Sequence, residues 1–455
     1  MPAPRRPAYL EALATFLADT SYSVLPAAVV ERARWILADC LPVIAAGMQE
    51  REMKALVAEH LGGGSGGDAT VFGAGRSASA LDAALLNGTA GTWLELDEGN
   101  LFAKGHPGIQ VVPAAVAVAQ ESGASGRELL RAVALGYEVS SRIHRAANVK
   151  LAVHPHGTYG VIGAALAVGL LRGFDRAQLL ELVNVSATMG MATSRQTLLD
   201  GATVRNIYTG HSGYMGIMAA RLVASGFTGE IDSVAAIYGK VLSDTFVPDR
   251  VVADLGSDWL ITKSYFKLHP TGRYVHSAID ALEDLLAKVP GGSLAPDAIE
   301  RLDVRAYHLA AMLQEKAVRT SFGARFSVPF ALASIVVRGR SGLASFDDAA
   351  VADPVTQALA QRVDLHEDPA FSARFPAEQP VLLRATMRDG SLYEGSCTVT
   401  KGEPTRPHTE AELAAKFRDL GDPIWGAATT AALLDGLGKV ETIDDFRLFM
   451  KGLAL

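Results

Sequence analysis

The spacing of hydrophobic residues predicts that residues 1–266 are almost entirely helical. Apolar side chains recur every three to four positions in residues 9–20 and 26–48, which is the period of one buried helix face. A glycine-rich run over residues 61–77 interrupts this pattern with a turn and a short extended piece. The helical period then returns, and we expect further helices over residues 79–96, 125–146, 160–172, 175–190 and 203–225.

The pattern changes near residue 267, where alternating apolar and polar residues predict strands. Residues 299–310 and 381–400 alternate in this way, and Asp389-Gly390 in the second stretch is a strong signal for a tight hairpin. Helical periods are expected over residues 276–289 and 327–339, and again from residue 408.

These patterns predict a mainly α protein made of two domains. Residues 1–266 and 404–455 would form a large all-helical domain, and residues 267–403 an α+β domain inserted into it. A chain of 455 residues is too long for one small core, which agrees with this division. Hydrophobic residues make up 49% and charged residues 20% of the chain, a composition typical of a compact globular protein.

Charge and hydropathy narrow the kinds of partner. The net charge is −7 and the sequence has no basic stripe interleaved with aromatic residues, so we expect no nucleic acid partner. The longest apolar run, residues 161–171, is well short of the roughly 20 residues that cross a bilayer. The N-terminal residues lack the apolar core of a signal peptide, and we expect a cytoplasmic protein. Cys40 and Cys397 are too few to ligate an iron–sulfur cluster.

Four segments gather polar residues beside glycines and helix starts, and more than half of the eleven histidines fall in them. A metal site is disfavoured because no His-Glu-x-x-His pattern occurs, and a nucleophilic serine because Gly-x-Ser-x-Gly is absent. The mixture of arginine, lysine and histidine instead fits proton transfer at a carbon next to a carboxylate. That reaction needs a base, together with cations placed where enolate charge develops. The four segments are residues 95–108, 154–165, 201–216 and 263–280.

Long blocks in and around these segments resemble the MmgE/PrpD family. The blocks are LNGTAGTWLELDEGNLFAKGHPGIQVVPAAVAVA, HPHGTYGVIGAALAVGLLRGFD, GATVRNIYTGHSGYMGIMAARLVASGFTG and KLHPTGRYVHSAIDAL, and ARFSVPFALA at 324–333 is similar to a fifth. That family includes 2-methylcitrate dehydratase, cis-aconitate decarboxylase and iminodisuccinate epimerase. The resemblance implies proton transfer on a small di- or tricarboxylate without a metal or an organic cofactor. It also implies a helical domain, an α+β domain, a cleft between them and a homodimer.

The resemblance further implies roles for individual residues. His106 stands in the family's Gly-His-Pro block, His154 opens the next block and Lys267 precedes a proline in the fourth, so these three would be catalytic. Without the resemblance, His106 could equally be a loop histidine bonded to the backbone, and Lys267 an ordinary surface lysine. The expected substrate-binding residues are Arg205, Arg273, Asp97, Asn100, Tyr159 and His276.

Two departures from the family pattern lead us to expect an epimerase. The run from Asp97 to Asn100 differs from the acidic stretch common in relatives, and Phe330 stands where decarboxylase-like members carry tyrosine. An epimerase needs only one proton-transfer group on each face of a planar intermediate, which His106 and Lys267 would supply. The expected substrate is an iminodisuccinate-like dicarboxylate. A hydro-lyase of the methylcitrate or aconitate type stays open as the alternative, as does a non-catalytic helical protein that binds a metabolite, whereas the missing hydroxyl at Phe330 weakens a decarboxylase.

Overall fold

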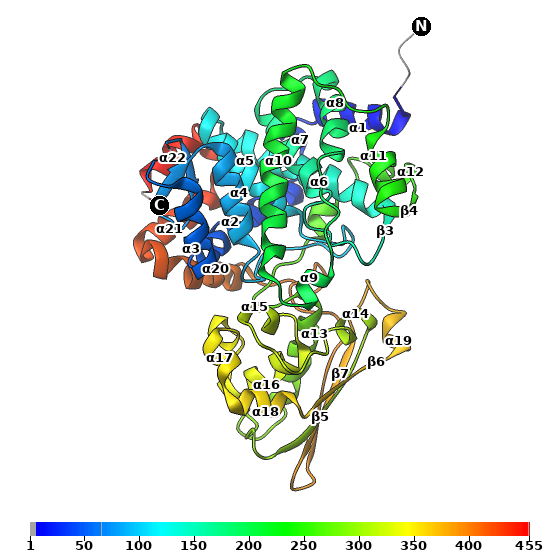
Figure 1. The fold of residues 1–455 in the computed structure, drawn as a ribbon, viewed down its shortest axis with the longest axis vertical. Helices are drawn as coiled ribbons and strands as arrows, with labels where there is room; N and C mark the ends of the chain where they lie inside the picture. Colours follow the sequence, from blue (N-terminus) through cyan, green and yellow to red (C-terminus); the bar gives the residue numbers. More distant parts are fainter. Residues whose placement is uncertain (1–5, 65, 454) are drawn as a thin grey trace.

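The computed structural model describes residues 6–64, 66–453 and 455, and it confirms a mainly α fold with a smaller sheet-containing part (Figure 1). The two parts lie at opposite ends of an elongated molecule. Each part has its own hydrophobic cluster, one built from side chains within residues 9–266 and 413–450 and the other within residues 275–397. These two clusters support the division into two domains that we propose from the sequence, called the large and the small domain below.

Two helices that are buried on nearly all sides form the centre of the large domain. α5 (Pro107–Ser122) and α7 (Gly160–Leu171) consist mostly of alanine, valine, glycine and leucine, and almost every residue of both is buried. A helix that is apolar all round belongs in an interior, which agrees with the sequence pattern. The long helices that pack around this pair, directly or through one another, are α1 (Ala8–Asp19), α2 (Ala27–Gly47), α3 (Arg51–Leu61), α4 (Ala80–Gly91), α6 (Gly126–Ala146), α8 (Arg176–Ala187) and α10 (Ile207–Ala224).

The end of the chain returns to the large domain after the small one. α20 (Glu410–Trp425), α21 (Ala427–Gly438) and α22 (Phe446–Gly452) contribute buried side chains to the same cluster as the N-terminal helices. None of the described helices is both long and apolar enough to cross a membrane. The large domain also holds two small antiparallel pairs, β1 (Ala69–Val71) with β2 (Arg76–Ala78), and β3 (Ala147–Val149) with β4 (Ser243–Phe246).

A four-stranded sheet with the order β6-β5-β7-β8 forms one layer of the small domain. β5 pairs parallel with β6, while β5 with β7 and β7 with β8 are antiparallel. The expected hairpin connects β7 to β8, and Gly390 takes a positive φ of 87° there. α13 and α16 pack against the strands from one side (Figure 1). The bounds are β5 (Ile299–Ala306), β6 (Val363–Glu367), β7 (Val381–Met387), β8 (Leu392–Cys397), α13 (Arg273–Leu286) and α16 (Val328–Arg338).

Short helices line the boundary between the two domains. α9 (Gln196–Leu199) descends from the large domain toward α14 (His308–Ala311) and α15 (Ser321–Ala324) of the small one (Figure 1). The remaining short helices of the small domain are α17 (Asp348–Ala352), α18 (Pro354–Ala360) and α19 (Pro369–Ser372).

Candidate active site

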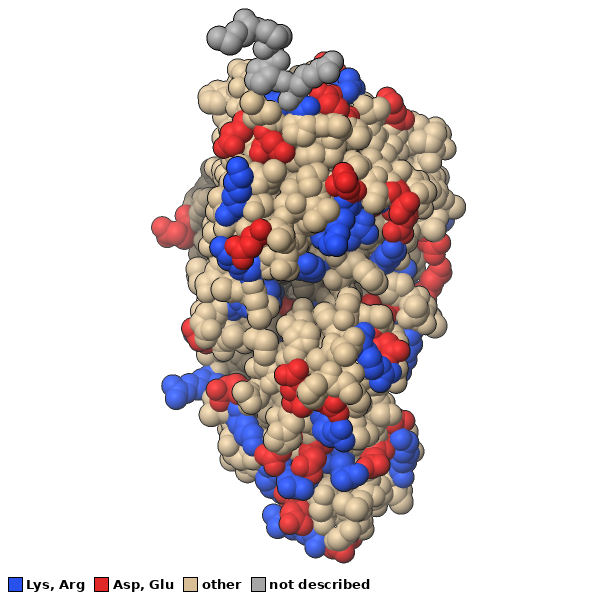
Figure 2. All heavy atoms as spheres, turned by 90° about the vertical axis from the view of Figure 1, so that its right-hand side faces the viewer, with Lys and Arg blue, Asp and Glu red and all other residues tan. Residues whose placement is uncertain are grey.

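A cavity of about 560 Å³ lies between the two domains and receives residues from both. Figure 2 shows the surface hollowed about halfway along the molecule, with lysine and arginine side chains close to the hollow. All four polar segments singled out in the sequence contribute to its lining. Their polar residues in the lining are Glu95, Asn100, Lys104, His106, His154, His156, Arg205, Tyr265, Arg273 and Tyr274.

The loop between α4 and α5 carries the largest share of these groups. Pro107 occupies the first turn of α5, where its missing N–H costs nothing, and so fixes the helix start directly after His106. Glu95 and Lys104 adopt left-handed backbone conformations with φ of 53° and 55°. Non-glycine residues rarely adopt such angles, and strained backbone of this kind concentrates at functional sites. The loop is therefore held in one specific shape by its surroundings.

His106 is oriented by two acceptors on one side of its ring. Its Nδ1 lies 2.9 Å from Asp97 Oδ2 and 2.6 Å from the carbonyl oxygen of Glu98. A carbonyl only accepts, so Nδ1 carries a proton and donates it, which leaves Nε2 as the nitrogen available to the cavity. Burial raises the pKa of Asp97, but His106, Lys267 and Arg205 outweigh this and hold it well below its usual value. Asp97 therefore stays a carboxylate that fixes the orientation of the ring.

Lys267 lies behind this pair and is fully buried. Its Nζ is 3.3 Å from Asp97 Oδ1 and 3.5 Å from Glu95 Oε2. A buried ammonium between two carboxylates is compensated in place, so Lys267 links the two acids rather than standing alone as a base.

Arg205 connects the polar segment 201–216 to the ion pairs formed by Glu95, Asp97 and Lys267. It lies in the short turn Thr203–Asn206 that precedes α10, and its Nη2 lies 2.7 Å from Glu95 Oε1. Its Nε is 3.4 Å from His154 Nε2. The guanidinium group therefore borders the cavity with one edge and holds Glu95 with the other.

His154 and His156 present two neutral rings to the cavity. Burial, followed by the charge of Arg205, lowers the pKa of both well below the ordinary histidine value. The amide N–H of His156 donates to His154 Nδ1 at 3.1 Å. Both ring nitrogens of His156 are buried without a partner among the described residues. An unpaired buried polar group requires an explanation, and a bound substrate would supply the missing hydrogen bonds.

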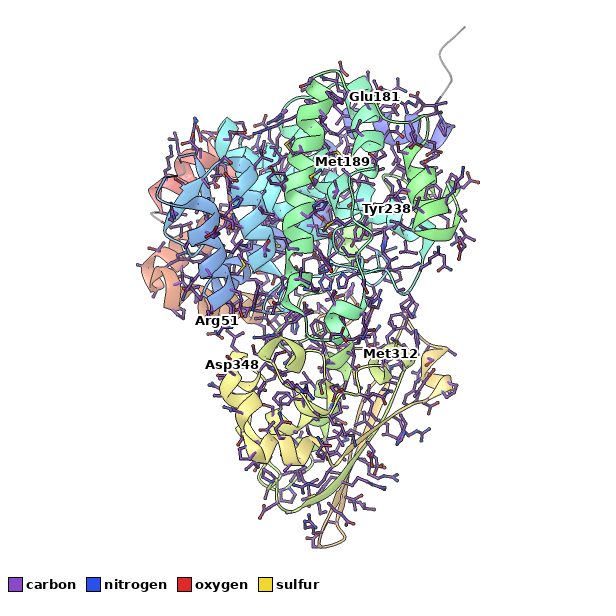
Figure 3. All side chains as sticks on the ribbon, in the orientation of Figure 1. Arg51, Glu181, Met189, Tyr238, Met312 and Asp348 are labelled. Atoms are coloured by element: carbon purple, nitrogen blue, oxygen red, sulfur yellow. The ribbon has the colours of Figure 1, made fainter. Side chains whose placement is uncertain are left out.

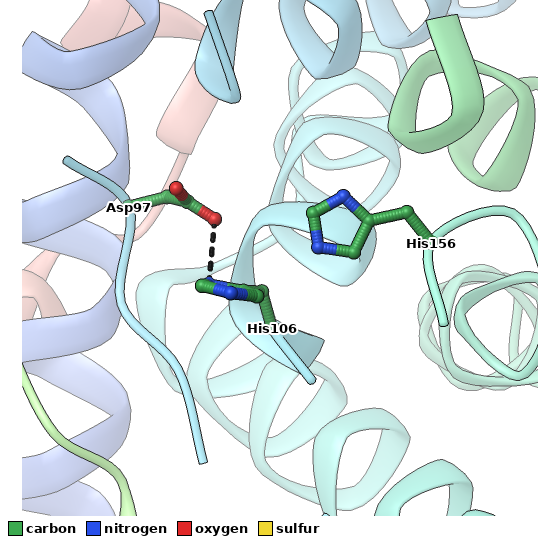
Figure 4. Close-up of side chains that lie close together, drawn as sticks. All are labelled: Asp97, His106 and His156. Atoms are coloured by element: carbon green, nitrogen blue, oxygen red, sulfur yellow. Dashed lines mark ion pairs between the residues drawn. The ribbon is translucent and has the colours of Figure 1, made fainter. Parts of the chain in front are cut away.

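Asp97, His106 and His156 lie close enough to one another to be considered as ligands of one metal ion (Figure 4). Asp97, His106 and His156 offer one ligand atom each within 4.8 Å of one another. Figure 4 shows His106 paired with Asp97 on one side and the His156 ring on the other. The His106 Nδ1 is committed as a donor, and the Lys267 ammonium already faces Asp97. The arrangement fits a metal poorly, because a second cation beside Asp97 would be repelled by the Lys267 ammonium.

Arg273 and His276 stand in a second cluster at the start of α13. Arg273 Nη2 and Nε donate to Glu403 Oε1 at 2.7 and 3.1 Å, and its guanidinium carbon lies 4.3 Å from the centre of the Tyr265 ring. His276 Nε2 is 3.2 Å from the Thr271 carbonyl oxygen. Arg273 lines the cavity, but most of its donors are used within the protein, which favours a supporting role over a carboxylate clamp.

Three further residues from the sequence analysis are placed outside the reacting centre. Asn100 donates to the Leu260 carbonyl at 2.7 Å and accepts from the two amides of the loop that follows it, so its polar atoms are used to hold that loop. Tyr159 stacks on His144 with ring centres 4.3 Å apart and is not among the lining residues. Phe330 belongs to the hydrophobic cluster of the small domain. The missing hydroxyl at Phe330 therefore says nothing about proton donors in the cavity, where Tyr265 offers a phenol.

Two cations in the lining carry no acidic partner. Lys104 Nζ donates to the Ala147 carbonyl at 3.2 Å and Arg195 Nε to the Leu151 carbonyl at 2.6 Å. Within the described residues neither forms an ion pair, and burial lowers the pKa of both. Lys104 is exposed and Arg195 partly buried, and a cation without a counter-ion attracts an anionic ligand. Lys104 lies in the polar segment 95–108 without a role of its own assigned there, and Arg195 lies outside the four segments and carries no signal beyond its charge.

Residues far along the chain support the loop from behind. Lys416 of α20 forms a buried ion pair with Asp39 at 2.5 Å and donates to the Leu96 carbonyl at 2.6 Å. Arg325 donates to the carbonyls of Leu94 and Pro270 at 3.2 and 3.1 Å, and so joins the loop before Asp97 to the segment after Lys267.

Comparisons with known proteins agree on one family and one kind of relative. The family described as MmgE/PrpD N-terminal domain matches residues 11–247, and MmgE/PrpD C-terminal domain matches residues 269–435. Cis-aconitate decarboxylase of Aspergillus terreus (strain NIH 2624 / FGSC A1156) is 23% identical, with 92% of this chain and 91% of that protein covered. The cis-aconitate decarboxylase-like protein oryM of Aspergillus oryzae is 23% identical, with 95% and 94% covered. The Homo sapiens cis-aconitate decarboxylase is 22% identical, with 80% and 77% covered.

Proposed function

The chain belongs to the MmgE/PrpD family, and from this premise we propose that it is a lyase acting on a small tricarboxylate of the cis-aconitate type. The relatives named as cis-aconitate decarboxylases support this class of reaction and substrate. The cations of the cavity support an anionic substrate, since Lys104, Arg195 and Arg205 all reach its lining. The relatives reported above are named as decarboxylases, so they give the epimerase expected from the sequence no support.

The observation that carries the proposal is the one-sided placement of the proton-transfer groups. An epimerase needs a proton carrier on each face of a planar intermediate. Lys267, the second carrier expected from the sequence, instead lies between Asp97 and Glu95, on the same side as the acid that orients His106. A lyase needs proton delivery from one side, which a single His106–Asp97 pair supplies.

In the proposed decarboxylation, the bond between the departing carboxylate carbon and its neighbour breaks and carbon dioxide leaves. The electron pair stays on the carbon skeleton, where the conjugated carboxylate carries the developing charge. Arg205, His154 and His156 line the same cavity and would bind the carboxylate that carries this charge. Protonated His106 then gives the proton on Nε2 to the carbon, and solvent returns one proton to the ring. The reaction consumes one proton for each carbon dioxide released.

A hydro-lyase of the aconitate type is the second candidate, favoured by Tyr265. Dehydration requires an acid that protonates the departing hydroxide. Tyr265 lines the cavity, and burial raises its pKa well above the usual tyrosine value, so the phenol keeps its proton. The same network would bind the substrate in either case.

Proton NMR in heavy water with cis-aconitate, citrate, methylcitrate and iminodisuccinate separates these reactions. We expect cis-aconitate to lose carbon dioxide and the product to carry one deuterium at the protonated carbon. Hydration of cis-aconitate, or loss of water from citrate or methylcitrate, would establish the hydro-lyase instead. Deuterium exchange and inversion of iminodisuccinate without a new alkene would establish the epimerase and refute the proposal.

A matched pair of variants tests the assignment of His106. His106→Gln should abolish turnover, while His366→Gln, an exposed histidine on β6, should leave it unchanged. Full activity of His106→Gln would remove this residue from the mechanism.

A further inference from the structure

One side of the cavity is apolar and has no part in the proposed chemistry. In addition to the polar groups described above, the lining includes leucine, methionine and phenylalanine side chains from α9, α14 and the loops beside them. Three of these are unusually exposed for their type, with Leu151 at 53%, Met312 at 41% and Leu199 at 36%. We call this surface the apolar wall, and it consists of Leu151, Leu198, Leu199, Leu309, Met312 and Phe375.

The apolar wall draws on both domains. Leu198 and Leu199 belong to α9 of the large domain, whereas Leu309 and Met312 lie in and after α14 of the small one. Figure 3 places Met312 at the boundary between the domains, on the small-domain side. The wall shares one continuous cavity with His106, Arg205 and the unpaired cations, so a single ligand can contact both surfaces.

A tricarboxylate alone has no use for such a surface. Its charged groups gain by contact with Arg195, Arg205 and Lys104, and they lose hydration against leucine and methionine. Ligand cavities of this size typically hold molecules with a substantial apolar part, which contacts the hydrophobic lining while a few polar groups fix the orientation. Exposed apolar side chains gathered at a site also indicate an apolar partner.

We propose that the substrate is a polycarboxylate with an alkyl chain of several carbons, and that the apolar wall binds this chain. The carboxylates lie at the cationic end beside His106, and the chain extends between α9 and α14. This inference rests on the proposed function for the reacting end of the molecule, and adds the class of substituent that the cavity selects.

The chain-length dependence of binding gives the expected size of the effect. Each methylene group that moves from water onto an apolar surface is expected to tighten binding about fourfold. Affinity should therefore rise steadily along an alkyl series until the chain outgrows the wall. Burial of apolar surface should also make the heat-capacity change of binding more negative with each added methylene.

Calorimetric titration of the full-length protein with methyl-, butyl- and hexylsuccinate tests this without any turnover. We expect the dissociation constant to fall at least tenfold from methyl- to hexylsuccinate, with a growing negative heat-capacity change. A constant or rising dissociation constant would overturn the proposal. That result would mean that the apolar wall is covered by contact between the two domains and does not bind a ligand.

Two variants locate the effect on the apolar wall. Met312→Gln keeps the length of the side chain but makes its end polar, and should reduce the preference for hexyl- over methylsuccinate several-fold. Leu448→Gln, at an exposed leucine on α22, should leave that preference unchanged. An undiminished preference in Met312→Gln would overturn the assignment to this wall.

Turnover of alkyl-substituted cis-aconitates separates this proposal from the one on which it rests. If cis-aconitate and its hexyl derivative react, and the derivative has the higher kcat/KM, both proposals stand. Reaction of cis-aconitate with a lower kcat/KM for the derivative would refute the alkyl substrate but keep the lyase. Tight binding of hexylsuccinate without turnover of either acid would refute the lyase and keep the apolar subsite.

Discussion

Replacing His144 by asparagine should make the large domain less sensitive to acid. His144 is buried on α6, and its Nδ1 lies 2.7 Å from the Ala103 carbonyl, in the loop that carries Lys104 and His106. Burial lowers the pKa of His144 from the ordinary 6.5 to about 4. Asparagine can keep the hydrogen bond to Ala103 through its amide while removing the titration.

The magnitude follows from the two protonation equilibria. The unfolded chain binds a proton at His144 below pH 6.5, but the folded protein does so only below about pH 4. The contribution of this residue to stability is therefore complete above pH 6.5 and decreases as the pH falls, by about 1.4 kcal/mol per unit. At pH 5 the wild type should have lost about 2 kcal/mol through His144 alone, a loss that the variant avoids.

Tryptophan fluorescence during urea unfolding measures this difference in the correct domain. All four tryptophans, Trp35, Trp93, Trp259 and Trp425, lie in the large domain. The loss of unfolding free energy between pH 8 and pH 5 should be about 2 kcal/mol larger for the wild type than for His144→Asn. Equal losses in the two proteins would show that the buried ring titrates normally, and the reasoning from burial would fail.

Three other substitutions test individual parts of the site. Asp97→Asn removes the carboxylate that orients His106, and it should lower kcat about 10²- to 10⁴-fold in steady-state assays. The control variant Asp435→Asn, on the exposed face of α21, should leave kcat unchanged. An active Asp97→Asn enzyme would contradict the role of the His106–Asp97 pair. Arg325→Met removes the hydrogen bonds to the Leu94 and Pro270 carbonyls. It should lower kcat about 10²-fold, while a thermal-shift assay shows that the protein is folded. An unchanged kcat would show that Arg325 does not position the loop that carries Asp97. Phe330→Tyr buries a hydroxyl in the small-domain core, so the unfolding free energy should fall by about 1–3 kcal/mol with the reaction unchanged; a new activity would reinstate the argument made from the sequence.

Much of the fold could be predicted because its elements carry strong periodic patterns. The apolar runs of α5 and α7 and the Asp389-Gly390 hairpin each identify an element locally. β6 escaped prediction because Val363–Glu367 contains only two apolar positions, and because its partner β5 is reached by a long crossover that leaves no local signal. The parallel pair is decided by tertiary packing and not by the residues of the strand.

The candidate site, like the fold, could be predicted from the sequence only in part. Four polar segments could be selected from the sequence, and the structure brings all four to one cavity. Which of their side chains face a ligand depends on partners far away in the chain. Arg273 resembled a carboxylate clamp until Glu403, 130 residues later, proved to occupy its guanidinium group. His156 lies in one of the four polar segments but had no assigned role there, and its ring, whose nitrogens have no hydrogen-bond partner among the described residues, lies beside that of His106.

The contact between Lys416 and the Leu96 carbonyl has a consequence for how the protein is made. The two residues are separated by 320 positions, and the loop that carries Asp97 leaves the ribosome long before α20 has been translated. The ammonium group that supports this loop, and its ion pair with Asp39, become available only after α20 has been translated. A nascent or prematurely terminated chain therefore lacks this support for its proton-transfer pair. Activity should arise only once α20 has emerged, and not progressively as the N-terminal helices of the large domain emerge.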